Sequence, residues 1–190
     1  MTGYWNDPRN TAEAITEDGW LRTGDIAEIR EGRIFIRGRL RDKIVLSTAK
    51  KVAPSEVEAA IEADPLFEQV CVFGDDRPCL VAVAVLNGEA WQALAREAGL
   101  DAGAPNHPAA TARLLARIAR ATEGLPSYSR VRGLHSQLRP WTIEDGTLTP
   151  TLKVRRHVIE ARNRAEIGAL YESLGQERRQ ARPGRAPKEA

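Results

Sequence analysis

The chain has 190 residues, of which 42% are hydrophobic and 28% charged, and its 28 Lys and Arg nearly balance its 26 Asp and Glu. This composition is typical of a soluble globular protein with room for one full domain and part of another. The near-neutral charge gives no reason to expect nucleic acid as a partner. The longest apolar run, residues 79–86, is too short to span a bilayer, and no signal peptide is recognisable, so we expect a cytoplasmic protein. Neither Cys71 nor Cys79 belongs to a Cys/His cluster, and we expect no metal site.

Residues 1–37 contain one helical pattern followed by strand patterns. A helix is expected near residues 10–15, with Asn10 or Thr11 as its N-cap. Residues that favour β structure then predict three short strands, at residues 20–25, 26–30 and 33–37. So short a segment cannot bury a core of its own. We therefore expect it to be the end of a larger domain.

From residue 39 the pattern predicts a compact α+β unit, a short antiparallel or mixed sheet packed by helices. Strands are expected at residues 43–47, 67–74 and 79–86 and within residues 131–143. Helices are expected from Pro54, near residues 88–98 and 108–122, and within residues 154–174. Apolar periodicity ends at Gly175, which predicts a disordered tail over residues 175–190.

Three motifs occur in order along the chain. They are Asp-Gly-Trp-Leu-Arg-Thr-Gly-Asp at residues 18–25, Gly-Arg-Leu-Arg-Asp-Lys at residues 38–43 and Leu-Thr-Pro-Thr-Leu-Lys at residues 148–153. In this order they resemble the C-terminal part of acyl-adenylate-forming enzymes, and the third motif resembles the long-chain acyl-CoA synthetases. The sequence lacks the Gly, Ser and Thr-rich loop ending in Lys-Gly with which that family holds the ATP phosphates. The chain is therefore interpreted as a fragment that is inactive alone.

The resemblance implies a domain organisation. Residues 1–38 are expected to be the last strands of the N-terminal, nucleotide-binding domain. Residues 39–174 are expected to form the small, mobile C-terminal domain, with a helical insertion at about residues 88–124.

Two residues are predicted to bind nucleotide. A carboxylate after a tight Thr-Gly pair, here Asp25, suits two adjacent ribose hydroxyls, although a turn-capping role is the alternative. The resemblance favours the first role, because the aspartate of the family's Arg-Thr-Gly-Asp motif binds ribose. Arg39 matches a family arginine that contacts the nucleotide; a solvated surface arginine is the alternative.

Lys153 is the predicted catalytic residue. An ammonium group there would stabilise the charge that grows on the acyl carboxylate and α-phosphate during adenylation. Taken alone, a lysine after Thr-Pro-Thr-Leu would be assigned to the surface, and its place in the third motif is what resembles the family's adenylation lysine. The family's hinge position is matched by Arg41, followed by Asp42.

The loop Ser47, Thr48, Ala49 and Lys50 matches the family loop that approaches the CoA channel after the domain rotates. The family usually has Gly where Ala49 stands. Alanine lacks the conformational freedom of glycine, so either thioester formation is slower or the loop accommodates the methyl group.

The resemblance implies a parent enzyme that uses ATP and Mg²⁺ to convert a fatty acid to acyl-AMP and then to acyl-CoA. Its partners would be fatty acid, ATP and CoA, with peripheral membrane association left open. No Mg²⁺ ligands are predicted in this chain. Two alternatives remain: a related ligase that transfers the acyl group to a carrier protein, and a free-standing, non-catalytic binding or regulatory module.

Overall fold

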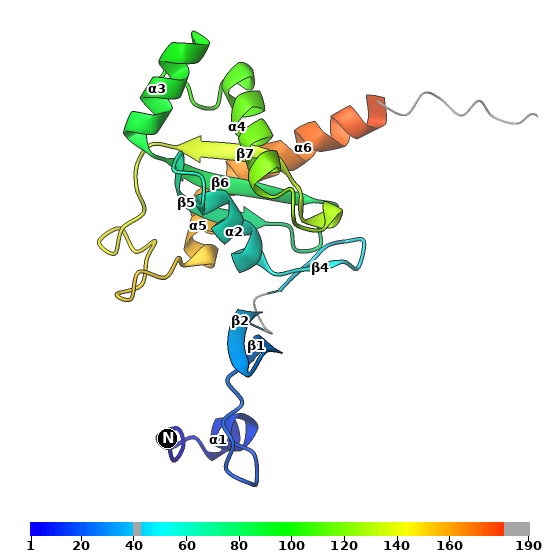
Figure 1. Cartoon of the computed structure of the whole chain (residues 1–190), viewed down its shortest axis with the longest axis vertical. Coiled ribbons are helices and arrows are strands. Elements are labelled where there is room, and N and C mark those ends of the chain that lie inside the picture. The colour runs from blue at the N-terminus through cyan, green and yellow to red at the C-terminus, as the bar shows by residue number, and fades with distance from the viewer. Residues whose placement is uncertain (40–42, 181–190) are drawn as a thin grey trace, which may run out of the picture. The chain divides into compact units, whose positions relative to one another are not determined.

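The computed structural model describes residues 1–39 and 43–180. The chain forms two compact units, Met1–Lys43 and Ile44–Ala190, each of which is described by itself below (Figure 1). The predicted α+β class is confirmed, since short strands and helices occur together in both units. The predicted hinge residues Arg41 and Asp42 lie outside the described residues.

The first unit begins with helix α1 (Pro8–Ala14). Its N-cap is Asp7, whose carboxylate accepts a hydrogen bond from the Asn10 N–H at 3.1 Å, and Pro8 occupies the first turn. The predicted N-cap at Asn10 or Thr11 is thus wrong, because Asp7 and Pro8 together start the helix earlier. The predicted strand at residues 20–25 is reduced to one bridge between Ile15 and Leu21.

A two-stranded hairpin completes the first unit. Strands β1 (Asp25–Arg30) and β2 (Arg33–Arg39) pair in antiparallel register, and both turn residues, Glu31 and Gly32, have positive φ. Such a turn matches the twist of the strands it joins. The cross-strand partners Ile29 and Ile34 remain 72% and 68% exposed. This cross-strand pair therefore buries little apolar surface.

The second unit is built on a three-stranded sheet. Its order is β5 (Phe67–Phe73), β6 (Leu80–Leu86), β7 (Val131–Gln137), with β6 antiparallel to β5 and parallel to β7. Side chains of the central strand alternate between two cores. Leu80, Ala82, Ala84 and Leu86 face one, and Val81, Val83 and Val85 face the other. All seven are buried, as expected of an apolar strand that is covered on both faces.

Helices supply both covering layers (Figure 1). Helices α2 (Pro54–Glu62), α3 (Gly88–Ala98) and α4 (Pro108–Ala121) pack into the first core, where Ala110, Leu114 and Ile118 of α4 repeat at helical spacing. Helices α5 (Arg156–Arg162) and α6 (Arg164–Gln180) supply Ile159 and Ile167 to the second core.

Helix α6 extends beyond the predicted start of the tail. Residues 175–180, which were expected to be disordered, are helical. Leu174 packs against the second core, so the helix is already formed at that point, and extending it by one residue adds a backbone hydrogen bond at little cost in conformational entropy. The residues that follow include Gln, Glu and Arg, which are good helix formers. Residues 181–190 lie outside the described part of the chain.

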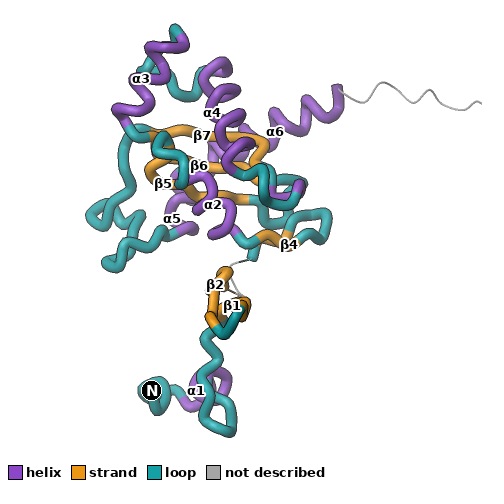
Figure 2. The backbone as a smooth tube through the Cα atoms, viewed as in Figure 1, coloured by secondary structure: helices purple, strands orange, loops and turns teal. Residues whose placement is uncertain are grey.

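Two irregular regions carry the remaining predicted site residues of this unit. Strands β3 (Ile44–Val45) and β4 (Lys51–Val52) form a short hairpin before α2. A long loop connects β7 with α5, visible as the teal tube between them in Figure 2. The short 3₁₀ helix η1 (Ser127–Ser129) precedes β7.

Candidate functional site

Lys153 lies at the end of a closed turn, residues 149–153, which we call the lysine loop. The Thr149 N–H donates to the Lys153 carbonyl at 2.8 Å, and the Lys153 N–H donates to Thr149 Oγ1 at 3.0 Å. Leu148 and Val154, the residues that flank the turn, form an antiparallel β-bridge. Leu152 has a φ of 59° and is 69% exposed. A bulky residue in the left-handed region is strained, so the backbone bonds hold this turn against its local preference.

The chain that enters the lysine loop is organised by one carboxylate. Asp145 Oδ1 accepts hydrogen bonds from the Thr147 N–H at 2.9 Å and from the Thr147 hydroxyl. The Asp145 N–H in turn donates to Thr142 Oγ1 at 3.1 Å, and the Leu148 N–H donates to the Thr142 carbonyl at 3.0 Å. The Thr147 bonds, together with Arg162, lower the pKa of Asp145 to about 2. Asp145 is thus an anion that closes the turn just before the loop.

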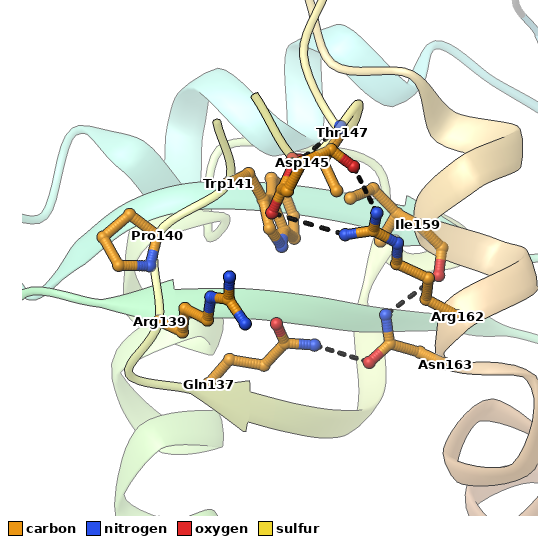
Figure 3. Close-up of a pocket in the computed structure, with 9 residues that line it drawn as sticks. All are labelled: Gln137, Arg139, Pro140, Trp141, Asp145, Thr147, Ile159, Arg162 and Asn163. Atoms are coloured by element: carbon orange, nitrogen blue, oxygen red, sulfur yellow. Dashed lines mark hydrogen bonds and ion pairs between the residues drawn. The ribbon is translucent and has the colours of Figure 1, made fainter. Parts of the chain in front are cut away.

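Two contacts fasten this turn to the sheet and to α5. Arg162 reaches Asp145 Oδ2 at 3.3 Å and also donates to the Asp145 carbonyl (Figure 3). On the other side, the Gln69 amide of β5 donates to the Trp141 carbonyl at 3.2 Å and accepts from the Trp141 N–H at 2.7 Å. A cavity of about 190 Å³ lies beside this turn, and its lining includes Trp141, Asp145 and Arg162.

The chain that leaves the lysine loop is fastened by Arg156. Its guanidinium lies 2.8 Å from Glu58 of α2, donates to the Val72 carbonyl of β5 at 2.5 Å, and approaches Cys71 Sγ at 3.2 Å. Burial raises the pKa of the Cys71 thiol to about 12, so the sulfur is present as the neutral thiol. The Arg155 N–H also donates to the Thr147 carbonyl at 2.8 Å, which ties the outgoing chain to the incoming one.

The second predicted loop, Ser47 to Lys50, is the tip of the β3–β4 hairpin. The Leu46 N–H donates to the Lys50 carbonyl at 2.9 Å, and the Ala49 N–H donates to the Leu46 carbonyl at 2.8 Å. Ala49 has a φ of 60°. This conformation is one that glycine adopts without cost and alanine does not. All four predicted residues of this loop are exposed.

This hairpin is fixed by the β5–β6 turn. The Ser47 N–H donates to the Arg77 carbonyl at 2.9 Å, and Asp75 Oδ1 accepts from the Val45 N–H at 3.0 Å. The Arg77 guanidinium lies 4.9 Å from the ring centroid of Tyr171 on α6. The Tyr171 hydroxyl lies 3.1 Å from the carbonyl oxygens of both Phe73 and Cys79, at the two ends of the turn, and its single proton is shared between these acceptors. Helix α6 thereby supports the hairpin through the turn.

The predicted nucleotide residues of the first unit are paired by backbone register. Asp25 opens β1 and stands directly opposite Arg39, the last residue of β2. Its N–H donates to Thr23 Oγ1 at 3.1 Å, and Gly24 before it has a φ of 73°. The hairpin thus brings together two residues that the sequence analysis assigned to the same ligand. Lys153 and the loop at Ser47 belong to the other unit.

Several residues that shape these loops were missed from the sequence. They are Asp145, Arg156 and Arg162 at the lysine loop and Asp75, Arg77 and Tyr171 at the hairpin. The signal available was weak: Asp145 precedes a Gly, which indicates a turn, but its distant arginine partner has no sequence pattern. Among the described residues, no group of three His, Cys, Asp or Glu side chains is placed to hold a metal ion. No helix in the described part of the chain is long and apolar enough to cross a membrane.

Residues 41–175 match the family model of the AMP-binding enzyme C-terminal domain. The chain belongs to this family. The match covers the second unit from its start to residue 175, including the β3–β4 hairpin and the lysine loop. The motif resemblance is thereby confirmed at the level of the family.

Known relatives of this AMP-binding C-terminal domain include ligases of two kinds. The long-chain-fatty-acid–CoA ligase FadD15 of Mycobacterium tuberculosis is 33% identical over 90% of this chain and 29% of its own length. The long-chain-fatty-acid–[acyl-carrier-protein] ligase AEE15 of Arabidopsis thaliana is 32% identical over 90% of this chain and 24% of its own length. The chain therefore spans less than a third of either relative.

A solved structure supports the same fold. The A-PCP didomain of carboxylic acid reductase from Segniliparus rugosus, in complex with AMP, aligns with a TM-score of 0.77 and 32% identity, covering 92% of this chain and 24% of that chain. Strands, helices and loops of this AMP-binding C-terminal domain therefore follow an arrangement found in acyl-adenylate-forming enzymes.

Proposed function

We propose that this chain is the C-terminal part of a long-chain fatty-acid–CoA ligase, which joins fatty acid and CoA with cleavage of ATP to AMP and pyrophosphate: the fatty-acid carboxylate displaces pyrophosphate to form acyl-AMP, and CoA then displaces AMP. The observation that carries the proposal is the lysine loop. It presents Lys153 at the exposed end of a closed turn within a domain of the AMP-binding family. The similarity to FadD15 supports the choice of a fatty acid as the substrate class.

Lys153 would serve the first half-reaction. Its ammonium group would lie beside the acyl carboxylate and the α-phosphate and stabilise the negative charge that grows there as acyl-AMP forms. Charge stabilisation of this kind requires a group that is already in position before the reaction. The hydrogen bonds that close residues 149–153 fix the backbone from which the Lys153 side chain extends.

Asp25 and Arg39 would bind the nucleotide. A carboxylate accepts hydrogen bonds from two ribose hydroxyls, and a guanidinium donates to ribose or phosphate oxygens. Their opposed positions on β1 and β2 support a shared ligand. Arg41 and Asp42 would form the hinge about which the second unit rotates between the two half-reactions.

The loop Ser47 to Lys50 would serve the second half-reaction by lining the path of CoA. Its backbone is closed by hydrogen bonds and its tip is exposed, as a surface that meets an elongated ligand requires. Ala49 supplies a methyl group where a glycine would allow closer approach.

The described residues include no cluster suited to Mg²⁺. We assign no Mg²⁺ ligand of the parent enzyme among these residues, and no step here passes through the ion. The chain alone lacks the loop that would hold the ATP phosphates, and we expect it to be inactive.

A carrier-protein acceptor is the second candidate. The similarity to AEE15, whose name specifies the acyl-carrier protein, favours it. A direct comparison of CoA with holo-acyl-carrier protein as acceptor separates the two candidates, since the favoured proposal requires transfer to CoA.

The test uses this chain alone and fused behind the N-terminal part of FadD15 that precedes the match. ATP–pyrophosphate exchange with palmitate should be absent for the chain alone and present for the fusion. In the fusion, Lys153→Ala should reduce exchange by a factor of about 10² or more, while CoA attack on supplied palmitoyl-AMP changes far less. Arg113→Ala on the exposed side of α4 is the control for loss of a cation elsewhere.

Two outcomes would contradict the proposal. Robust exchange by the chain alone would show that it is not a fragment. Equal loss of both half-reactions in Lys153→Ala would show that the lysine holds the domain together instead of serving one step.

A further inference from the structure

We propose that Asp145 and Arg162 are positioning residues for Lys153, acting as a latch that sets the lysine loop for adenylation. The inference rests on the proposed function of Lys153. It concerns two side chains that contact each other and the turn at Thr142 and Thr147, and whose influence on Lys153 passes through the backbone.

The first step of the latch is local. Asp145 fixes the turn before the lysine loop, because one of its oxygens accepts both the N–H and the hydroxyl of Thr147. Thr147 is 1% exposed, so its groups have little access to water as an alternative partner. Without this acceptor the Thr147 N–H would lose its hydrogen bond, which is costly for a buried donor, while the hydroxyl would keep the Thr142 carbonyl at 3.1 Å as its acceptor.

The second step carries this order into the loop. The Thr147 carbonyl accepts the Arg155 N–H at 2.8 Å, and the neighbouring Leu148 forms the bridge with Val154. These two connections join the strands that enter and leave the lysine loop. A displacement of Thr147 therefore moves both ends of residues 149–153.

The third step fastens the latch to the body of the domain. Arg162 belongs to α5, and α5 is anchored in the second core by Ile159, which is fully buried. Its guanidinium holds Asp145 at two atoms, Oδ2 at 3.3 Å and the main-chain carbonyl. Such a two-point contact fixes orientation as well as distance.

A cavity lies beside the latch. About 190 Å³ is left open among Asp145, Thr147 and Arg162, with Trp141 as one wall (Figure 3). Trp141 and Leu148, on the two sides of the turn, pack into the second core, but packing leaves this space unfilled. The Asp145–Arg162 pair lines the space and adds a constraint to that packing.

The structural part of the proposal is tested by amide hydrogen exchange on the purified chain. Arg162→Gln should raise exchange at Thr147, Leu148 and Lys153 by about tenfold or more, and Arg162→Lys, which keeps the charge but not the fork, should raise it less. The matched control is Arg117→Gln, which breaks the pair of Arg117 with Asp64 at 2.7 Å between α4 and the end of α2. That variant should leave the exchange of the lysine loop unchanged.

The catalytic part is tested in the fusion with the N-terminal part of FadD15. Arg162→Gln should lower the kcat of pyrophosphate exchange by about 10- to 100-fold with little change in the KM for ATP, as expected for a misplaced catalytic group. CoA attack on supplied palmitoyl-AMP should keep its rate. Arg162→Lys should recover part of the kcat, and Arg117→Gln should match the wild type in both steps.

The outcomes separate the two proposals. A wild-type fusion without pyrophosphate-exchange activity overturns the proposed function. In that case the amide hydrogen exchange of the purified chain still decides whether the latch orders the loop. An active fusion in which Arg162→Gln behaves like Arg117→Gln overturns the latch alone. A uniform fall of both half-reactions would assign Arg162 to general stability and also overturn it.

Discussion

The lysine loop and the β3–β4 hairpin solve the same backbone problem in different ways. Each is a tight turn closed by main-chain hydrogen bonds, and each contains a residue other than glycine at positive φ, Leu152 at 59° and Ala49 at 60°. The hairpin is held by main-chain contacts, such as Ser47 with Arg77 at 2.9 Å, and by one carboxylate, Asp75, which accepts from the Val45 N–H at 3.0 Å. The lysine loop depends on charged side chains from α2 and α5.

This difference predicts that the two loops respond differently to substitutions and to pH. Main-chain contacts respond to changes in backbone conformation and hardly to charge. Ion pairs respond to the removal of one partner and to pH. The lysine loop is therefore expected to be disturbed by substitution of charged residues outside the loop itself, and the hairpin by substitutions at its own turn.

The largest expected effect comes from Arg156, which fastens the outgoing side of the lysine loop. Arg156→Ala removes the ion pair with Glu58 and the donor to Val72, and leaves both acceptors partly buried. We expect unfolding to be easier by about 2 kcal/mol, between the values for surface and buried pairs. Urea unfolding monitored by circular dichroism measures the change.

The neighbouring Arg155 provides the control for that measurement. Its side chain is exposed and forms no capping hydrogen bond with α5. Arg155→Ala should change the free energy of unfolding by no more than about 0.5 kcal/mol. Equal effects at the two positions would show that the side-chain contacts of Arg156 do not hold the loop.

Much of the second unit could be predicted from local patterns. The apolar run at residues 80–86 and the start of α2 at Pro54 follow from burial on both faces and from the fixed φ of proline. The order of the three motifs along the sequence also identified the family, because recognising these motifs requires only residue types and their order, and no distances between residues in the folded chain.

The supports of the two loops could not be predicted in this way. Arg156 and Cys71 are 85 residues apart, and only the packing of α5 against β5 brings them together. The left-handed conformation of Leu152 carries no sequence signal, since the usual indicator is glycine. Ala49 is different: the family resemblance indicated glycine there, and the φ of 60° supplies the physical reason.

A smaller effect of opposite sign is expected at the hairpin. Ala49→Gly relieves a left-handed alanine, and the gain exceeds the entropy that glycine adds to the unfolded chain, so we expect stabilisation by about 0.5–1 kcal/mol. The matched control is Ala112→Gly on an exposed position of α4, which should destabilise by about 1 kcal/mol. Thermal unfolding of both variants measures the contrast. A loss of stability in Ala49→Gly would mean that the methyl group contributes packing that outweighs its strain.

The smallest effect concerns pH and distinguishes the loops directly. The pKa of Asp145 is about 2 in the folded chain, below its ordinary value near 3.9. Unfolding therefore takes up a proton at this site, and the stabilisation is complete above about pH 4 and is lost as the pH falls toward 2. Between pH 5 and pH 3, amide hydrogen exchange corrected for intrinsic rates should rise more at Thr147 and Leu148 than at Ala49. Asp145→Asn should show faster exchange at Thr147 already at pH 5 and a smaller further change at pH 3. If the variant instead keeps the full wild-type response between pH 5 and pH 3, the acid sensitivity of the lysine loop comes from another group, and charge at Asp145 is not what separates it from the hairpin.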